Sequence, residues 1–102
     1  MSRIRVAGLA ERDLDAIWLY AAKKSQSIEI ADSIINSIVD SFAMLARTPE
    51  AGTRREHLEA GLRGFPVGNY IIYYRETRGR VLISRVLHGR RDQKPACLED
   101  GQ

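Results

Sequence analysis

The chain is poor in residues that build covalent or metal-bound scaffolds. It has one cysteine, Cys97, so no internal disulfide can form and no Cys-x-x-Cys metal site is present. Its two histidines, His57 and His88, lie far apart in the sequence, which argues against a zinc site. We therefore expect no metal and no cofactor, and we interpret Cys97 as an unreactive thiol of a reducing compartment.

Long apolar runs are also missing. No stretch approaches the roughly 18 apolar residues that a membrane-spanning helix needs. The N-terminal residues Met1-Ser2-Arg3-Ile4-Arg5 carry charges early and lack the apolar segment of a signal peptide. The sequence therefore predicts a cytoplasmic protein with no membrane partner.

What the chain has is the composition of a small folded domain. Of its 102 residues, 44% are hydrophobic and 28% are charged, which argues against global disorder. We expect one domain over residues 1–92 and a polar tail over residues 93–102. The net charge of +3 favours an acidic partner over a basic one.

The first half of the chain predicts a short strand and two helices. Residues 3–7 alternate charged and apolar side chains, which is typical of a strand with one wet face. A first helix begins at Gly8 and ends near Lys24, and Ser27 is a suitable N-cap for a second over residues 28–46. So short a connection predicts an antiparallel hairpin. Its apolar stripe comprises Leu14, Ile17, Trp18, Ile34, Ile38, Phe42 and Leu45.

The second half predicts a loop and three strands. Residues 50–61 show no period and are interpreted as loop. Residues 62–67 form a weak strand near an edge, because Gly64 and Pro66 interrupt them. The β-prone residues 70–75 and 81–88 follow after short turns, which predicts a three-stranded antiparallel meander. The fold class is α+β: helices cover one sheet face, and the other face is expected to be partly polar, open and suited to binding.

The last strand ends in a dense run of charge. Ile83-Ser84-Arg85-Val86-Leu87-His88-Gly89-Arg90-Arg91-Asp92 passes from β-branched and apolar residues into a histidine, a glycine and two arginines. Glycine breaks the strand, and the arginines place fixed positive charge at its edge. The pattern favours recognition of an anionic partner.

This run and three earlier segments together resemble the ParE/RelE superfamily, the toxins of bacterial toxin–antitoxin pairs. The other segments are Ala10 with Asp13-Leu14 and Ile17 to Tyr20, Phe42-Ala43-Met44-Leu45-Ala46 with Pro49 and Gly52, and Leu62-Arg63 with Asn69 to Arg75. The resemblance covers nearly the whole chain. It implies a RelE/ParE-like fold and an antitoxin partner in a hetero-oligomer, in systems of the kind that stabilise plasmids.

Two departures decide the branch of the superfamily. RelE-type ribonucleases typically place an arginine directly after the tyrosine of the central strand, and here Ile71 follows Tyr70. They often keep a tyrosine shortly after the last basic strand residues, and residues 93–97 contain none. The resemblance therefore implies a ParE-type toxin that inhibits DNA gyrase without catalysis or direct nucleic-acid readout. It also implies a ParD-like antitoxin with a C-terminal segment that folds on binding.

Two alternatives stay open. One is a RelE-type ribosome-dependent endoribonuclease that cuts messenger RNA and uses Arg85, His88, Arg90 and Arg91 in place of the usual catalytic set. The other is a degenerate toxin that only binds its antitoxin. In the ParE-type interpretation there is no catalytic residue, and the predicted target-binding residues are Arg63, Arg75, Arg85, His88, Arg90 and Arg91.

The strand arginines and the aromatic residues each have two interpretations. Arg63, Arg75 and Arg85 either join in one basic sheet face or are three separate solvated side chains. The aromatic residues are expected to pack in the core or to contact the antitoxin, although tyrosines can also stack on bases. The predicted antitoxin-binding residues are Tyr70, Tyr73, Tyr74 and Trp18, and for Trp18 the helix stripe favours the core.

Overall fold

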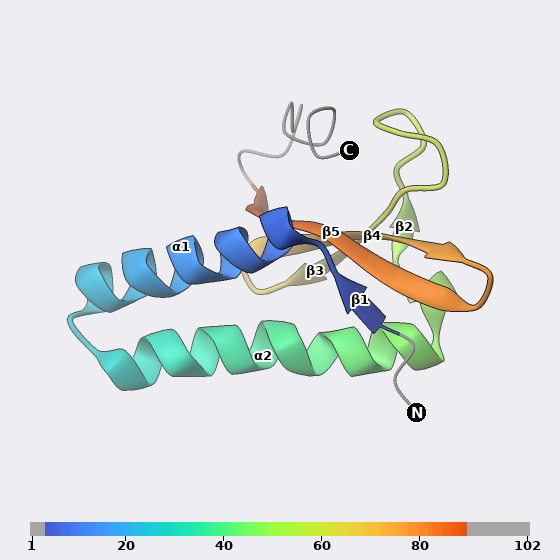
Figure 1. The fold of residues 1–102 in the computed structure, drawn as a ribbon. Helices are drawn as coiled ribbons and strands as arrows, with labels where there is room; N and C mark the ends of the chain where they lie inside the picture. The colour runs from blue at the N-terminus through green and yellow to red at the C-terminus, as the bar shows by residue number, and fades with distance from the viewer. Residues whose placement is uncertain (1–3, 90–102) are drawn as a thin grey trace.

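Two helices form an antiparallel hairpin along one face of a five-stranded mixed sheet (Figure 1). The computed structural model describes residues 4–89. Strand β1 (Ile4–Val6) leads directly into α1 (Gly8–Ser25), and α2 (Ile28–Arg47) follows after a tight connection. The predicted order of strand, helix and helix is therefore confirmed, with helix ends within a residue or two of those expected.

Local chemistry sets the ends of the two helices. Gln26 adopts the left-handed conformation (φ 56°) that ends α1, after two lysines in the last turn that suit the helix dipole. The Ser27 hydroxyl accepts a hydrogen bond from the Ile30 N–H at 3.2 Å, as expected of an N-cap. At the other end the Thr48 N–H donates to the Met44 carbonyl, and Pro49 prevents continuation.

The sheet has the strand order β1-β5-β4-β3-β2. Strands β3 (Arg63–Val67), β4 (Tyr70–Thr77) and β5 (Arg80–His88) form the predicted antiparallel meander. Strand β1 pairs with β5 in parallel, which makes the sheet mixed. This pairing could not be predicted from local patterns, because β1 is only three residues long and its partner is the last strand.

The loop predicted over residues 50–61 is only partly a loop. A short 3-10 helix, η1 (Pro49–Ala51), precedes a further strand, β2 (Thr53–Arg54), which pairs with Arg63 and Gly64 of β3. A strand of two residues is too short to show a period of hydrophobicity, so the sequence could not reveal it.

The main core lies between the hairpin and the sheet. Most of the predicted stripe is there, but Trp18 is not: it is only half-buried, and its indole N–H donates to the Asp32 carboxylate at 2.7 Å. The expectation that Trp18 is a core residue was wrong, because its face of α1 turns toward α2 rather than the sheet. The buried core residues are Ala10, Ile17, Ile38, Phe42, Leu45, Ile72, Tyr74, Val81, Ile83 and Val86.

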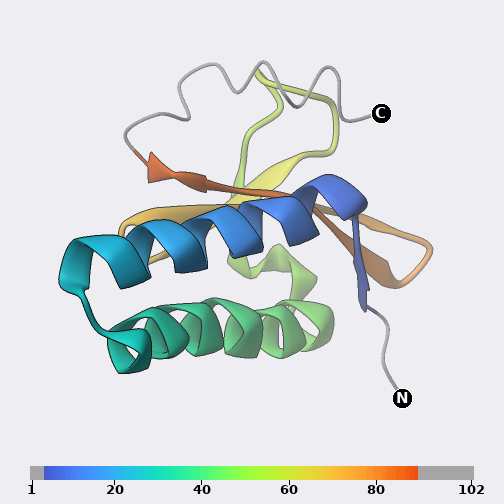
Figure 2. The ribbon, with the colours of Figure 1, turned by 60° about the vertical axis from the view of Figure 1, so that its left-hand side comes forward.

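The opposite sheet face is not the open polar surface that the sequence predicted. Leu62 and Tyr73 are fully buried there, with Leu58, Ile71 and Leu87 packed against them. The segment between β2 and β3 supplies Leu58 and Leu62, and it lies on the side of the sheet away from α2 (Figure 2). Apolar residues on both faces of β4 explain why that strand is almost continuously apolar.

Tyr74 ties the end of α2 to the sheet from inside the core. Its hydroxyl donates to the Pro49 carbonyl at 2.6 Å and accepts from the Gly52 N–H at 2.8 Å. Burial raises the pKa of Tyr74, an effect that the Gly52 hydrogen bond and the nearby Arg63 partly oppose. The phenol is therefore held neutral, as its hydrogen-bond donation requires.

We expect this phenol to make stability depend on alkaline pH. Its pKa is higher in the folded than in the unfolded state, so its contribution is complete below about pH 10 and is lost as pH rises through the folded value. Urea unfolding of the wild type and Tyr74→Phe should show a steeper alkaline loss in the wild type. At neutral pH the variant should lose about 1–3 kcal/mol, because two buried groups lose their partner. An equal loss of unfolding free energy with rising pH in both proteins would show that Tyr74 is not the group responsible.

Candidate functional site

A groove of about 550 Å³ opens between α1 and the adjoining ends of β4 and β5. It exists because β1 pairs only with Val81 to Ile83, so beyond that point α1 lies beside β5. The lining residues come from three elements: Asp13, Ala16, Ile17, Tyr20, Lys24, Tyr70, Val86, Leu87 and His88.

An aromatic pair occupies the sheet side of the groove. Tyr70 of β4 lies opposite His88 of β5 in the register, and their rings meet edge to face with centroids 5.4 Å apart. Burial raises the pKa of Tyr70, and the neighbouring Tyr20 raises it further. The groove thus places a neutral phenol beside the imidazole that the sequence singled out.

The helix side of the groove supplies a cation and an exposed aromatic ring. Tyr20 is 57% exposed. The Lys24 ammonium, on an exposed side chain, lies 5.7 Å from the centre of the Tyr20 ring and donates to its hydroxyl at 3.4 Å. A partner in this groove would meet apolar surface, aromatic edges and one positive charge.

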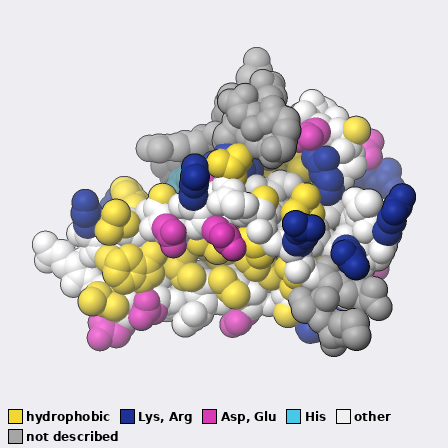
Figure 3. All heavy atoms as spheres, in the orientation of Figure 1, with side chains coloured by type: hydrophobic (Ala, Val, Ile, Leu, Met, Phe, Trp, Pro, Cys, Tyr) yellow, Lys and Arg dark blue, Asp and Glu magenta, His cyan; other side chains and the backbone are white. Residues whose placement is uncertain are grey.

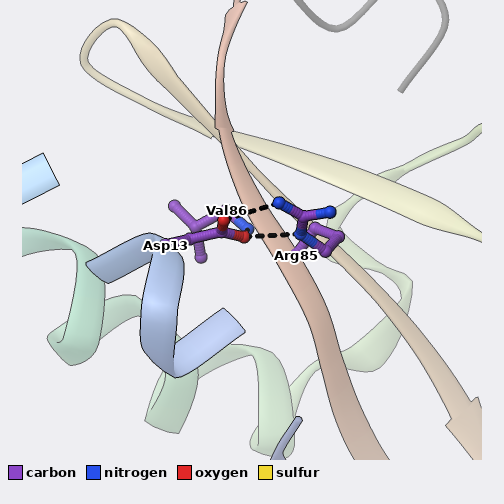
Figure 4. A network of polar contacts seen from close by, with 3 residues as sticks. All are labelled: Asp13, Arg85 and Val86. Atoms are coloured by element: carbon purple, nitrogen blue, oxygen red, sulfur yellow. Dashed lines mark hydrogen bonds and ion pairs between the residues drawn. The ribbon is translucent and has the colours of Figure 1, made fainter. Parts of the chain in front are cut away.

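The inner wall of the groove is held by a buried ion pair. The Asp13 carboxylate accepts from Arg85 Nε at 2.7 Å and Nη2 at 2.6 Å, and also from the Val86 N–H at 2.9 Å (Figure 4). Side-chain exposure is only 11% for Arg85 and 12% for Asp13. Asp13 therefore holds the Arg85 guanidinium in place. It also accepts a hydrogen bond from the backbone of β5 at a point where β1 no longer pairs with that strand.

The structure does not bring the three predicted strand arginines into one basic face. Arg63 lies opposite Tyr74 and donates to the Gly52 carbonyl at 2.8 Å. Arg75, the next residue after Tyr74, lies on the other face and forms an ion pair with Glu59 at 2.8 Å. With Arg85 bound to Asp13, the first of the two interpretations, a shared basic face, is wrong, and so is the second for Arg85, which is buried. Arg90 and Arg91 lie outside the described residues.

The predicted antitoxin-binding residues also have different positions. Tyr73 and Tyr74 have no exposed surface, so neither can contact a partner in this conformation. Tyr70 lines the groove, and Trp18 lies between the helices beside Asp32. Sequence reasoning missed the helix side of the groove. The spacing of Asp13, Tyr20 and Lys24, at i, i+7 and i+11, places them on one face of α1 and was the available signal.

Neither a metal site nor a membrane span is found in the described part of the chain. Among residues 4–89 no three His, Asp or Glu side chains are placed to hold a metal ion. No helix in that range is long and apolar enough to cross a bilayer.

Comparisons with known proteins identify the family. The model of the "ParE toxin of type II toxin-antitoxin system, parDE" matches residues 4–93. Toxin ParE1 of Caulobacter vibrioides is 34% identical over 88 residues, which cover 86% of this chain and 90% of that toxin. Toxin ParE3 of the same species is 32% identical over 78 residues, covering 76% and 77%.

Solved structures agree on the fold. The chain resembles one from the chromosomal ParDE toxin–antitoxin system of P. aeruginosa, with a TM-score of 0.74, 21% identity and coverage of 86% and 96%. It also resembles a chain of the RelBE2 toxin–antitoxin complex of Mycobacterium tuberculosis, with a TM-score of 0.60, 28% identity and coverage of 85% and 90%. The family match over residues 4–93 and the 34% identity to Toxin ParE1 show that the chain belongs to the ParE toxin family of type II toxin–antitoxin systems.

Proposed function

We propose that this toxin inhibits DNA gyrase by binding it without catalysis, in the cytoplasm. We further propose that a ParD-like antitoxin, whose C-terminal segment folds on contact, holds the toxin inactive in a hetero-oligomer. The observation that carries the proposal is the match to the parDE toxin model over residues 4–93, together with 34% identity to Toxin ParE1.

The position of Arg85 supports binding over catalysis. A ribonuclease needs mobile or substrate-facing cations around the scissile phosphate. Arg85, the first member of the alternative catalytic set, is 9% exposed and bound by the Asp13 carboxylate. Freeing it would leave the Asp13 charge buried without its partner, which costs several kcal/mol. The geometry therefore gives no support to the RelE-type alternative.

We propose that the target contacts the groove between α1 and β5. Tyr20, Tyr70 and His88 offer aromatic surface there, and Lys24 adds a positive charge. Tyrosine is typical of the energetic centre of protein interfaces, and a charged residue at the rim guides association. Arg90 and Arg91 follow His88-Gly89 directly in the sequence, and we propose that they add positive charge to the contact with the target.

Lys24, Arg90 and Arg91 should matter more for toxicity than for folding. We expect Arg90→Ala/Arg91→Ala, and separately Lys24→Ala, to weaken inhibition of gyrase supercoiling by about tenfold, a loss typical of one interface contact. For the exposed Lys24, unfolding free energy should change by less than about 0.5 kcal/mol. Supercoiling assays and urea unfolding give both numbers.

Lys23→Ala is the matched control, because Lys23 is an exposed lysine in the same helix turn that does not line the groove. It should leave inhibition unchanged. If the wild type has no effect on gyrase, or if primer extension shows cuts in ribosome-bound message, the proposed function is wrong. Full inhibition by both Lys24→Ala and Arg90→Ala/Arg91→Ala would reject the proposed contact surface alone.

A further inference from the structure

The hairpin has a solvent-facing side that the function proposed above does not use. One face of each helix turns toward the other helix and away from the sheet. Helical spacing of i, i+4, i+7 and i+11 selects four residues in each. We call this surface the outer seam, and it comprises Glu11, Asp15, Trp18 and Ala22 of α1 and Ile28, Asp32, Ile35 and Val39 of α2.

One hydrogen bond shows how the α1 residues and the α2 residues of the outer seam face each other. Trp18 Nε1 donates to Asp32 Oδ1 at 2.7 Å. Because the helices are antiparallel, one turn in either direction brings Ala22 opposite Ile28 and Asp15 opposite Ile35. The next turn adds Glu11 of α1 and Val39 of α2, where the two helices lie farther apart (Figure 1). The outer seam therefore runs along the hairpin.

The outer seam and its border expose several large apolar side chains to solvent. Ile28 is 60% exposed and Val39 42%, and Leu19, one residue from Trp18, is 50% exposed. The space-filling view shows apolar side chains gathered between α1 and α2 and at the end of the hairpin, with acidic side chains beside them (Figure 3). Contiguous exposed apolar surface with polar borders marks a protein-binding site.

The charge of the outer seam is opposite in sign to that of the whole protein. The strip has three carboxylates, Glu11, Asp15 and Asp32, and no lysine or arginine, although the chain carries +3 overall. Residues 28–46 of α2 add Glu29 and Asp40 and likewise contain no cation. A partner here meets negative charge, in contrast to the groove, where Lys24 supplies a positive charge.

The negative charge of the outer seam distinguishes between possible binding partners. A second copy docking by two-fold symmetry would place its own seam against this one, so carboxylates would face carboxylates. An acidic segment, which the net charge favours, would be repelled in the same way. A helix with apolar side chains bordered by lysine or arginine would satisfy both the apolar and the acidic parts of the strip.

We propose that the outer seam binds an amphipathic helix with basic flanks, and that the antitoxin supplies it. The source of the helix rests on the proposed function; its chemistry rests on the seam alone. The antitoxin would then lie on the hairpin with a basic segment, while the net positive charge elsewhere remains available to acidic residues of the same partner.

Two synthetic peptides test the chemistry directly. Both carry leucine at helical spacing along one face, bordered by lysine in one peptide and by glutamate in the other. Trp18 is the only tryptophan of the chain and lies in the seam, so its fluorescence reports binding. We expect the lysine peptide to bind the full-length protein at least about tenfold more tightly, because several rim charge pairs of up to about 1 kcal/mol each add up. Equal affinities, or tighter binding of the glutamate peptide, would overturn the proposal.

Charge-matched variants locate the effect. Glu11→Lys/Asp15→Lys should abolish the preference for the lysine peptide, whereas Glu56→Lys/Glu76→Lys makes the same charge change at exposed positions outside the hairpin and should retain it. Equal loss in both variants would show a general charge effect and reject the site. Circular dichroism confirms that each variant is folded before the comparison.

Neutralisation by the antitoxin tests the source of the helix. Against a co-expressed ParD-like antitoxin that protects cells from the wild type, Glu11→Lys/Asp15→Lys should escape neutralisation and Glu56→Lys/Glu76→Lys should not. If both stay neutralised, the antitoxin does not use the seam and the inference fails, while gyrase inhibition stands. If the wild type does not inhibit gyrase, the proposed function fails, while the peptide result still decides the seam.

Discussion

Replacing Asp13 by alanine is expected to lower the free energy of unfolding by about 3–5 kcal/mol, the usual cost of removing one partner of a buried ion pair. The Arg85 guanidinium would keep its charge at 9% exposure and lose both hydrogen bonds to the carboxylate. The Val86 N–H at the uncovered edge of β5 would lose its acceptor as well. Urea unfolding followed by circular dichroism measures the loss, which would be a large part of the stability of a small domain.

Two variants separate this charge effect from a general effect of mutating α1. Asp15→Ala removes an exposed carboxylate of the same helix and should change stability by less than about 0.5 kcal/mol. Asp13→Leu/Arg85→Met removes both charges and should cost less than Asp13→Ala, because no uncompensated charge stays buried. If Asp13→Ala costs no more than Asp15→Ala, the pair does not hold α1 against β5.

Elements with a clear period could be predicted from the sequence. The helices follow from an apolar stripe bounded by Ser27 and Pro49, and the meander follows from β-prone runs separated by turns. The parallel partner of β1 could not be predicted, because pairing across the whole chain leaves no local pattern. Strand β2 could not be predicted either, because two residues are too few to show a period. Trp18 was misplaced for a similar reason: a hydrophobic stripe does not tell which of its edges faces the second helix and which faces the sheet.

The candidate site was predictable only in part. His88 and Tyr70 were singled out separately, and their contact depends on a cross-strand register that the sequence does not state. Arg85 looked like a binding residue because its strand position is visible in the sequence and its partner is not. Asp13 lies 72 positions away and meets Arg85 only because α1 runs along the edge of β5. The sequence left open a shared basic face or three solvated arginines, and in the structure each arginine instead binds a separate partner.

Replacing Gly52 by alanine is expected to lower the free energy of unfolding by about 2–4 kcal/mol, from overpacking and disturbed buried hydrogen bonds together. The backbone there is extended, with φ −80°, so alanine is not strained by its own conformation. The cost is steric: a Cβ would lie 2.5 Å from the Tyr74 hydroxyl oxygen, 2.8 Å from Cε1 and 3.0 Å from the Gly64 carbonyl oxygen. Tyr74 has no exposed surface, so its ring cannot move into solvent.

Movement of the ring would also disturb the bonds that join the end of α2 to the sheet. The hydroxyl links the Pro49 carbonyl and the Gly52 N–H, and Arg63 donates to the Gly52 carbonyl. Gly8→Ala is the control, because no atom lies within 4 Å of its added Cβ and alanine favours the helix. Removing the hydroxyl relieves the shortest contact, so Gly52→Ala/Tyr74→Phe should lose at least about 0.5 kcal/mol less than the two single losses combined. Strict additivity in thermal or urea unfolding would show that this contact does not make glycine necessary at position 52.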